Sequence, residues 1–224
     1  NALTGTLPIQ NTISHMTALN QLIVYENAFN GTLPTELAEL TGLTSLSVAM
    51  NAFTGSLPTE LGRLTALQEM FADSNELMVG AFPTELGQLT ALTYLDLSAS
   101  SFTGTLPTEF GHLINLMYLV LNYNFLTGTL PTELGELTSL LTVHLQNNAF
   151  SGNMPPTLSK WSNVVDFVFS GTDLTGSVSE GLCDARLWNT LQGDCLRTND
   201  KIEIECQCCT ICCSTSGDNC QDMN

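Results

Sequence analysis

The sequence predicts an α/β repeat solenoid, in which each copy of a 24-residue unit contributes one short strand and one short helical turn. Three observations support this prediction. Shifting residues 116–140 by 24 positions places Gly128 on Gly104 or on Gly152. Apolar residues recur in the order LxxLxLxxN, and a Leu-Pro-Thr-Glu-Leu-Gly segment follows in most copies. A chain that repeats along most of its length forms one elongated array rather than several globular domains.

The LxL part of each copy predicts a short strand, because successive side chains of a strand point to opposite faces. A single copy cannot bury its apolar face, whereas copies stacked as a parallel sheet, with strands roughly 4.8 Å apart, bury it against each other. The inward pairs are Leu22 and Val24, Leu46 and Val48, Met70 and Ala72, Leu95 and Leu97, Leu119 and Leu121, Val143 and Leu145, and Phe167 and Phe169.

A polar position follows each strand. We expect an amide there to hydrogen-bond backbone groups of adjacent coils that would otherwise be buried unpaired. The position holds Asn27, Asn51, Asn75, Asn124 and Asn148, and the shorter Ser100 and Thr172 should leave local slack. Next comes a predicted second apolar column of Phe29, Phe53, Leu77, Phe102, Leu126, Phe150 and Leu174. One extra residue between Asn75 and Pro83 predicts a bulge in any sheet formed there.

The rest of each copy predicts a turn and one helical turn. A glycine suits a tight turn or an unusual backbone angle. Proline then fixes the first position of the helical turn, glutamate lies favourably near its N-terminal dipole, and glycine ends it. Only about one turn fits, which indicates a short or 3-10 helix on the outer side. Trp161 takes the core leucine position of the last full copy.

The combined pattern LxxLxLxxNxFTGTLPxELGxL resembles the plant-type leucine-rich repeat of receptor-kinase ectodomains and polygalacturonase-inhibitor-like proteins, over roughly residues 3–178. The Thr-Gly-Thr triplet and the Cys-rich tail are more similar to secreted algal repeat proteins. The resemblance implies a right-handed horseshoe with a parallel sheet on its concave face, a second short sheet, and 3-10 or short helical turns on its convex face. We expect about seven repeats in residues 1–182 and a disulfide-rich cap in residues 183–224.

The charge balance excludes several partners. With 22 Asp and Glu against 5 Lys and Arg, the formal net charge is −17. Nucleic acid and anionic membranes are therefore disfavoured, because both require clustered basic residues. No apolar run is long enough to span a bilayer, and the chain begins inside a repeat, so we expect a processed N-terminus.

The cysteines indicate a secreted or cell-surface protein. All eight lie in the tail: Cys183, Cys195, Cys206, Cys208, Cys209, Cys212, Cys213 and Cys220. An even number packed into a short segment favours disulfides, although their pairing stays open. Zinc at Cys209-x-x-Cys212 is the alternative, with no histidine nearby, and we expect no cofactor or metal. Asn30-Gly31-Thr32 is an N-glycosylation sequon.

The outward positions of the concave strands are the main candidate site. Tyr94 and Tyr118 lie in register on neighbouring strands, and exposed aromatics beside carboxylates favour a surface that binds a protein, peptide or glycan. The candidate ligand-binding residues are Tyr25, Glu26, Glu69, Phe71, Asp73, Tyr94, Asp96, Tyr118, Asn122, Tyr123 and His144. Although Asp166 is expected near His144, no nucleophile motif accompanies them, so we predict a non-enzymatic recognition module without catalytic residues.

Two alternative functions stay open. Flat Thr-x-Thr ladders resemble the surfaces of ice-binding solenoids, and here the ladder breaks at residues 79–81 and 151–153. The residues concerned are Thr4, Thr6, Thr103, Thr105, Thr127 and Thr129. A calcium-dependent adhesion or matrix protein is the other alternative, based on the glutamate column Glu36, Glu60, Glu85, Glu109 and Glu133. The favoured interpretation is that these glutamates cap the helical turns and extend into water.

Overall fold

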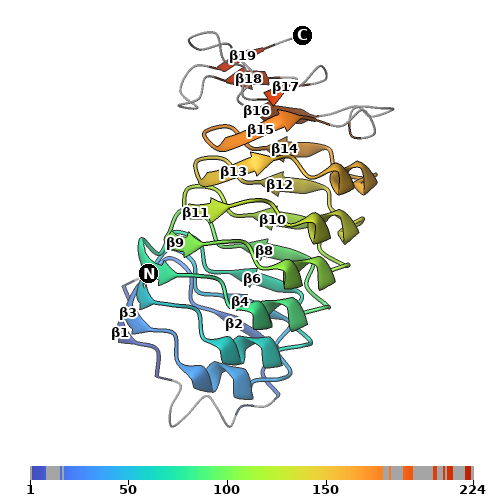
Figure 1. The fold of residues 1–224 in the computed structure, drawn as a ribbon. Coiled ribbons are helices and arrows are strands. Elements are labelled where there is room, and N and C mark those ends of the chain that lie inside the picture. Colours follow the sequence, from blue (N-terminus) through green and yellow to red (C-terminus); the bar gives the residue numbers. More distant parts are fainter. Residues whose placement is uncertain are drawn as a thin grey trace.

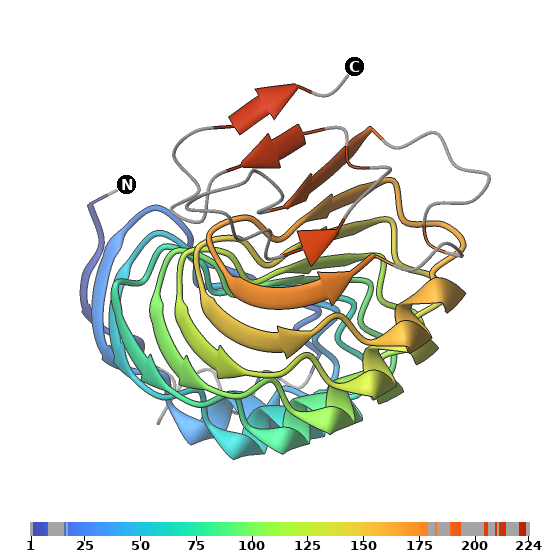
Figure 2. The same ribbon diagram turned by 45° about the horizontal axis from the view of Figure 1, so that its top comes forward.

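In the computed structural model, the chain is a stack of coils, each containing two strands and most containing a 3-10 helix (Figure 1). The structure describes residues 2–8, 16, 18–178, 182, 189–193, 204–205, 209, 211–213 and 220–222. Viewed along the stack, each coil is a flattened loop with one sheet on each of two sides and the helices on a third (Figure 2). The predicted horseshoe of parallel strands is confirmed.

The sheet on the concave face, here called the concave sheet, is ten-stranded and contains the predicted LxL strands. Its strands are parallel except for the last, which runs antiparallel to its neighbour. They are β2 (Gln21–Ile23), β4 (Ser45–Ser47), β6 (Glu69–Phe71), β8 (Tyr94–Asp96), β10 (Tyr118–Val120), β12 (Thr142–His144), β14 (Asp166–Val168), β16 (Thr190–Gly193), β18 (Ile211–Cys213) and β19 (Cys220–Asp222).

The second sheet has nine strands, and most of them follow the turn after a concave strand. It consists of β1 (Thr4–Thr6), β3 (Ala28–Thr32), β5 (Ala52–Gly55), β7 (Leu77–Gly80), β9 (Ser101–Gly104), β11 (Phe125–Gly128), β13 (Ala149–Asn153), β15 (Asp173–Ser177) and β17 (Ile204–Glu205). The strands of the tail thus extend both sheets.

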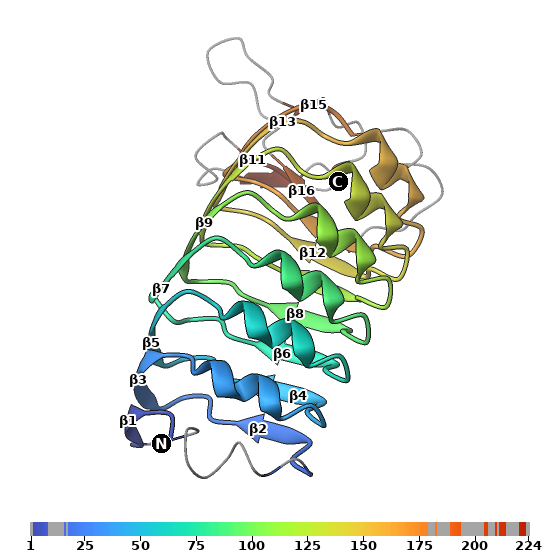
Figure 3. The same cartoon turned by 60° about the horizontal axis from the view of Figure 1, so that its bottom comes forward.

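The convex side carries a row of 3-10 helices (Figure 3). They are η2 (Thr35–Glu39), η3 (Thr59–Arg63), η4 (Thr84–Gln88), η5 (Thr108–His112), η6 (Thr132–Glu136) and η7 (Pro156–Lys160). Each is preceded by an N-cap proline in an extended conformation, so this proline lies one residue before the helical position that the sequence predicts for it.

One continuous apolar core runs through the whole stack. The inward residues of the concave strands, such as Leu95, Leu119 and Val143, are fully buried against the same residues of adjacent coils. Trp161 is also fully buried, and its indole Nε1 donates a hydrogen bond to the carbonyl oxygen of Leu134 at 2.8 Å. Because each coil buries its neighbours, the coils are stable only as a stack.

The prediction that Leu77 belongs to the second apolar column is wrong. Leu77 is 58% exposed, whereas Met78 is fully buried in its place. The extra residue is accommodated in the turn before β7, where the backbone N–H of Met78 donates to the carbonyl of Asn75 at 2.9 Å. Strand β7 then pairs with both β5 and β9, so the predicted bulge does not interrupt the sheet.

The asparagine column confirms its predicted role. The side-chain nitrogen of Asn124 donates to the carbonyl of Leu97 in the preceding coil at 2.8 Å and to that of Leu121 at 3.1 Å. Its oxygen accepts the backbone N–H of Phe102 at 3.0 Å. At the shorter Ser100, the expected slack is absent: the hydroxyl is buried, donates to the carbonyl of Ser98 and accepts the N–H of Asn75.

We expect Gly128→Ala to lower the free energy of unfolding by about 2–3 kcal/mol. Gly128 has φ +77°, a left-handed conformation, and an added Cβ would lie 2.7 Å from the Thr105 methyl carbon. Gly5 is the matched control, because its φ is +89° but nothing lies within 4 Å of a Cβ there. Gly5→Ala should cost only the backbone strain, about 1 kcal/mol. Denaturant unfolding measures both, and equal losses would contradict the steric part of this explanation.

Candidate functional site

Three aromatic side chains line up on the outward face of the concave sheet. Tyr94 pairs with Tyr118 in the parallel register of β8 and β10, and their ring centroids are 4.8 Å apart with an interplanar angle of 19°. Phe71 on β6 contacts the other side of Tyr94 at 4.9 Å and 42°. The spacing of the two tyrosine rings matches the strand spacing, so these rings stack straight across the sheet, whereas Phe71 is opposite Asp96 in the register and reaches Tyr94 diagonally. We call Phe71, Tyr94 and Tyr118 the aromatic ladder.

Carboxylates flank the aromatic ladder. Asp96 Oδ1 accepts the backbone N–H of Ser98 at 3.0 Å and its hydroxyl at 2.6 Å, which holds the carboxylate in place. Asp73 accepts the hydroxyl of Ser74 at 3.1 Å, and Glu69 accepts that of Ser45 at 3.1 Å.

Basic side chains are placed elsewhere. Within the described part of the chain, the only Lys and Arg are Arg63 and Lys160, both on convex helices. The concave sheet therefore presents acidic and aromatic groups without a compensating lysine or arginine among its described residues.

Burial disfavours the charged forms of Asp96 and Tyr94. It raises the pKa of the Asp96 carboxyl, which Asp73 raises further, while the hydrogen bonds from Ser98 act against the shift. Burial also raises the pKa of Tyr94, with smaller contributions from Asp96, Tyr118 and Asp73. A carboxylate kept at a desolvated position opposes folding at neutral pH, and such groups are concentrated in functional sites.

Asp96→Asn should raise the melting temperature by a few degrees at about pH 7 and by almost nothing at about pH 3. The pKa of Asp96 is higher in the folded chain than in the unfolded one, so ionisation favours unfolding. The favourable contribution of this group is complete below the usual carboxyl pKa and is lost as pH rises through the raised value. Asp173→Asn, at an exposed position of β15, is the control. A gain in melting temperature of the same size at both pH values would contradict the burial argument.

His144 lies one strand beyond Tyr118. Burial lowers the pKa of its imidazole, and the nearby Asp166 carboxylate acts in the opposite direction. The expectation that Asp166 lies near His144 on the next strand is confirmed.

The remaining predicted ligand-binding residues lie at different distances from the ladder. Tyr25 and Glu26 follow β2, which is two strands from β6, so they are separate from it. Tyr123 is 58% exposed in the turn after β10. Among the described residues, the side-chain oxygens of Asn122, which follows β10, and of Gln146, which follows β12, are buried without a hydrogen-bond partner.

The threonines of the ice-binding alternative are exposed on the second sheet. Thr103, Thr105, Thr127 and Thr129 occupy β9, β11 and the residues directly after them. Thr4 and Thr6 are exposed on β1, at the far end of that sheet. Val79 and Ala81 on one side and Ser151 and Asn153 on the other interrupt the ladder.

The glutamate column is part of the helical turns. Each of its members accepts a hydrogen bond from the preceding threonine hydroxyl at 3.2–3.4 Å, as between Thr132 and Glu133. No three His, Cys, Asp or Glu side chains come together as a metal site in the residues with described positions.

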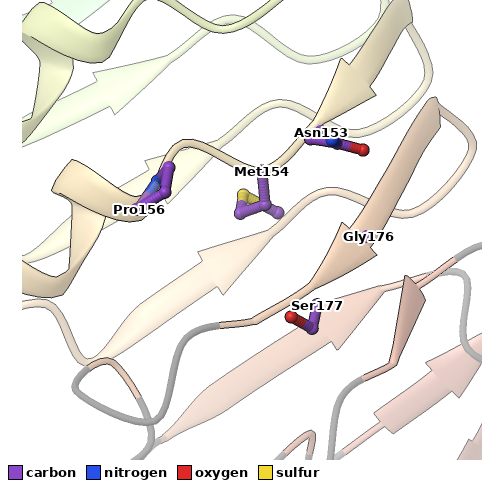
Figure 4. A pocket seen from close by; sticks show the side chains of 5 residues that line it. All are labelled: Asn153, Met154, Pro156, Gly176 and Ser177. Atoms are coloured by element: carbon purple, nitrogen blue, oxygen red, sulfur yellow. The ribbon is translucent and has the colours of Figure 1, made fainter.

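A pocket lies beside β13 and β15, which belong to the second sheet and not to the concave sheet (Figure 4). Its lining is Asn153, Met154, Pro156, Gly176 and Ser177, which includes no acidic or basic side chain. Asn30 of the glycosylation sequon is exposed on β3 of the same sheet.

The tail is described only in part. Cys209 is buried and disulfide-bonded. Cys212 and Cys213 belong to β18 and Cys220 to β19. The predictions for Cys183, Cys195, Cys206 and Cys208 lie outside the described residues.

Comparisons with known proteins agree with this geometry. The family model described as leucine rich repeat matches residues 90–150. Over 87% of its length, the chain superposes on the ectodomain of the Arabidopsis thaliana membrane receptor kinase GASSHO1/SCHENGEN3, with 34% identity and a TM-score of 0.81. The chain is a leucine-rich-repeat protein. That ectodomain was solved in complex with CASPARIAN STRIP INTEGRITY FACTOR 2.

Two further structures resemble this leucine-rich-repeat protein. The Arabidopsis receptor kinase HAESA, solved with the peptide hormone IDA and the co-receptor SERK1, is 31% identical over 80% of the chain, with a TM-score of 0.75. A plant ice-binding protein is 24% identical over 79% of the chain and 63% of its own length, with a TM-score of 0.59, which shows a shared fold. The chain spans only 23% of the GASSHO1/SCHENGEN3 ectodomain and 29% of that of HAESA.

No curated protein matches the leucine-rich-repeat sequence. Within the described ranges, none of the helices has the length and apolar character needed to cross a bilayer.

Proposed function

We propose that this leucine-rich-repeat protein is an extracellular, non-enzymatic recognition module that binds a peptide or a peptide-like segment of a protein across its concave sheet. The observation that carries the proposal is the aromatic ladder of Phe71, Tyr94 and Tyr118, half-buried on an outward sheet face beside Asp73 and Asp96. Aromatic anchors of this kind dominate the energetics of protein interfaces. The complex of the similar receptor kinase HAESA with the peptide hormone IDA supports the choice of ligand class.

The charge of the concave sheet favours a basic ligand. Complementary charge steers association and excludes partners of like charge, so an acidic face disfavours nucleic acid and acidic peptides. A glycan would also stack on tyrosines, but the acid-only surroundings of the ladder give a neutral sugar no advantage over a basic peptide.

An extracellular location is supported by the cysteines and by the relatives. Eight cysteines lie in the tail, Cys209 is disulfide-bonded, and the similar receptor domains are ectodomains. We infer that the tail forms four disulfides and caps the apolar core, and that Asn30 carries an N-glycan.

Peptide selection followed by hydrogen exchange tests the proposed function. Random peptides of about twelve residues are displayed against the full chain, and the best binder is synthesised. We expect the bound peptide to slow amide exchange in β6, β8 and β10, with no change in β9 and β11. Protection confined to the second sheet, or the absence of any binder, would contradict the proposal.

Ice binding is the second candidate, favoured by the exposure of Thr103, Thr105, Thr127 and Thr129 on adjacent strands of the second sheet. It predicts thermal hysteresis and faceted ice crystals, both lost when Thr105 and Thr127 are replaced by tyrosine. Unshaped crystals with the unmodified protein would exclude this function.

A further inference from the structure

A pocket, here called the rim pocket, opens where the concave sheet turns into the second sheet, between the coils of β4 and β6. Its volume is about 210 Å³, and its lining is Asn51, Ala52, Ser74, Glu76 and Leu77. These residues lie in the turns after β4 and β6 or begin β5 and β7. A cavity of about 150 Å³ already holds a molecule the size of benzene, so the rim pocket accommodates one branched aliphatic side chain.

Two large apolar side chains are exposed at the rim pocket. Because this copy of the repeat is one residue longer, Met78 fills the core in place of Leu77, which is 58% exposed. Met50 precedes the lining residue Asn51 and is 52% exposed. The two turns are joined, since the backbone N–H of Met50 donates to the carbonyl of Asp73 at 2.9 Å. Exposed apolar groups that gather at a pocket indicate an interaction site, whereas scattered ones do not.

The amide and hydroxyl groups of the lining already have partners inside the chain. The Asn51 side chain donates to the carbonyl of Val24 at 2.9 Å and accepts the backbone N–H of Phe29 at 3.0 Å. The Ser74 hydroxyl donates to the Asp73 carboxylate at 3.1 Å. An apolar occupant therefore leaves these groups paired, whereas a polar occupant would lose its hydrogen bonds to water without replacement.

The rim pocket is continuous with the candidate site through Asp73. In addition to burial, the charge of Asp73 raises the pKa values of Asp96 and Tyr94, so this carboxylate lies close to the ladder. Ser74 in the pocket wall is five positions beyond Glu69, the first residue of β6, which is roughly 17 Å along an extended strand. A peptide of about twelve residues spans roughly 40 Å when extended, so one ligand reaches both places.

Resting on the proposed peptide-binding function, we propose that the rim pocket is the seat for an aliphatic side chain, a leucine, isoleucine or methionine, of the peptide that crosses the aromatic ladder. This side chain contacts Ala52 and Leu77, the apolar members of the lining. The acidic member, Glu76, is exposed and repels an aspartate or glutamate of the peptide. Because the pocket lies at the β6 end of the ladder, it also fixes the direction in which the peptide crosses the sheet.

Parallel peptide selection on matched variants tests this inference. Ala52→Phe fills the rim pocket, and Ala28→Phe is the control, because both alanines are exposed first residues of their strands, β5 and β3. Peptides of about twelve residues selected on the full wild-type chain or on Ala28→Phe should share a leucine, isoleucine or methionine at one position. Peptides selected on Ala52→Phe should lack this shared residue.

Isothermal titration with the best wild-type binder measures the contribution of the seat. Replacing the shared aliphatic residue of the peptide by alanine should weaken binding about tenfold on the wild-type chain and less than about twofold on Ala52→Phe. Leu77→Ala, which removes part of the pocket wall, should weaken binding about fivefold. Its control is Phe125→Ala, because Phe125 is the 63% exposed first residue of β11, and this variant should bind within about twofold of the wild type.

The possible results separate the seat from the peptide-binding function. If the selected peptides need Tyr94 and Tyr118 but share no aliphatic residue, the aliphatic seat is overturned and the concave peptide site stands. Equal effects of the alanine replacement on the wild type and on Ala52→Phe would also overturn the seat, because the aliphatic residue would then bind elsewhere. If peptide binding is unchanged in the Tyr94→Ala and Tyr118→Ala double variant, the proposed function itself fails.

Discussion

Asn124→Leu will lower the free energy of unfolding by about 4 kcal/mol. The amide of Asn124 connects two coils, because it donates to the buried carbonyl of Leu97 and accepts the buried N–H of Phe102. A leucine has the same branched side-chain shape, with larger methyl groups in place of the amide, but leaves both backbone groups unpaired in the core. Each buried unpaired group costs roughly 1–3 kcal/mol. Denaturant unfolding followed by circular dichroism measures the loss.

Asn27→Leu is the matched control for this prediction. The oxygen of Asn27 accepts the N–H of Leu3 at 3.2 Å at an exposed position, where water can replace the amide. We therefore expect a loss of less than about 1.5 kcal/mol. If both variants lose the same amount, the asparagine column acts through packing and not through its hydrogen bonds.

The Tyr94→Ala and Tyr118→Ala double variant will bind the selected peptide at least about a hundredfold more weakly. The two rings form the centre of the ladder, and truncating central aromatic anchors commonly costs about 2 kcal/mol or more each. The melting temperature should change by only a few degrees, because both side chains lie on the outward face and not in the apolar core. Isothermal titration and thermal unfolding measure the two effects separately.

Tyr25→Ala provides the control for this binding experiment. Tyr25 is also an exposed tyrosine of the concave side, at 51%, but it follows β2, two strands from β6. It should leave peptide binding within about twofold of the wild type. An equal loss for Tyr25→Ala would indicate a ligand that covers the whole sheet, and unchanged binding of the double variant would contradict the ladder as an anchor.

Most of the fold could be predicted from the sequence, because the same pattern of apolar and polar residues recurs in every repeat. Leu95, Leu119 and Val143 are buried as their period requires, and the Asn124 amide bonds the adjacent coil. The error at Leu77 arose where one copy is a residue longer. Two adjacent apolar residues, Leu77 and Met78, fit the column equally well by composition, and only the path of the turn decides that Met78 is inward.

The candidate site could be predicted only in part. Register alone places Tyr94 beside Tyr118, and this was predictable from the period. The contact of Phe71 with Tyr94 is diagonal and depends on rotamers, and the fixing of Asp96 by Ser98 depends on the turn after β8. Ligand identity cannot follow from repeats that specify the core, because the outward residues differ from copy to copy.

The most direct test of the concave recognition site is the structure of the full chain with its selected peptide. The peptide should cross β6, β8 and β10 and contact the rings of Tyr94 and Tyr118. A peptide bound to the second sheet, or only along the rim at the exposed Met50 and Leu77, would contradict the account.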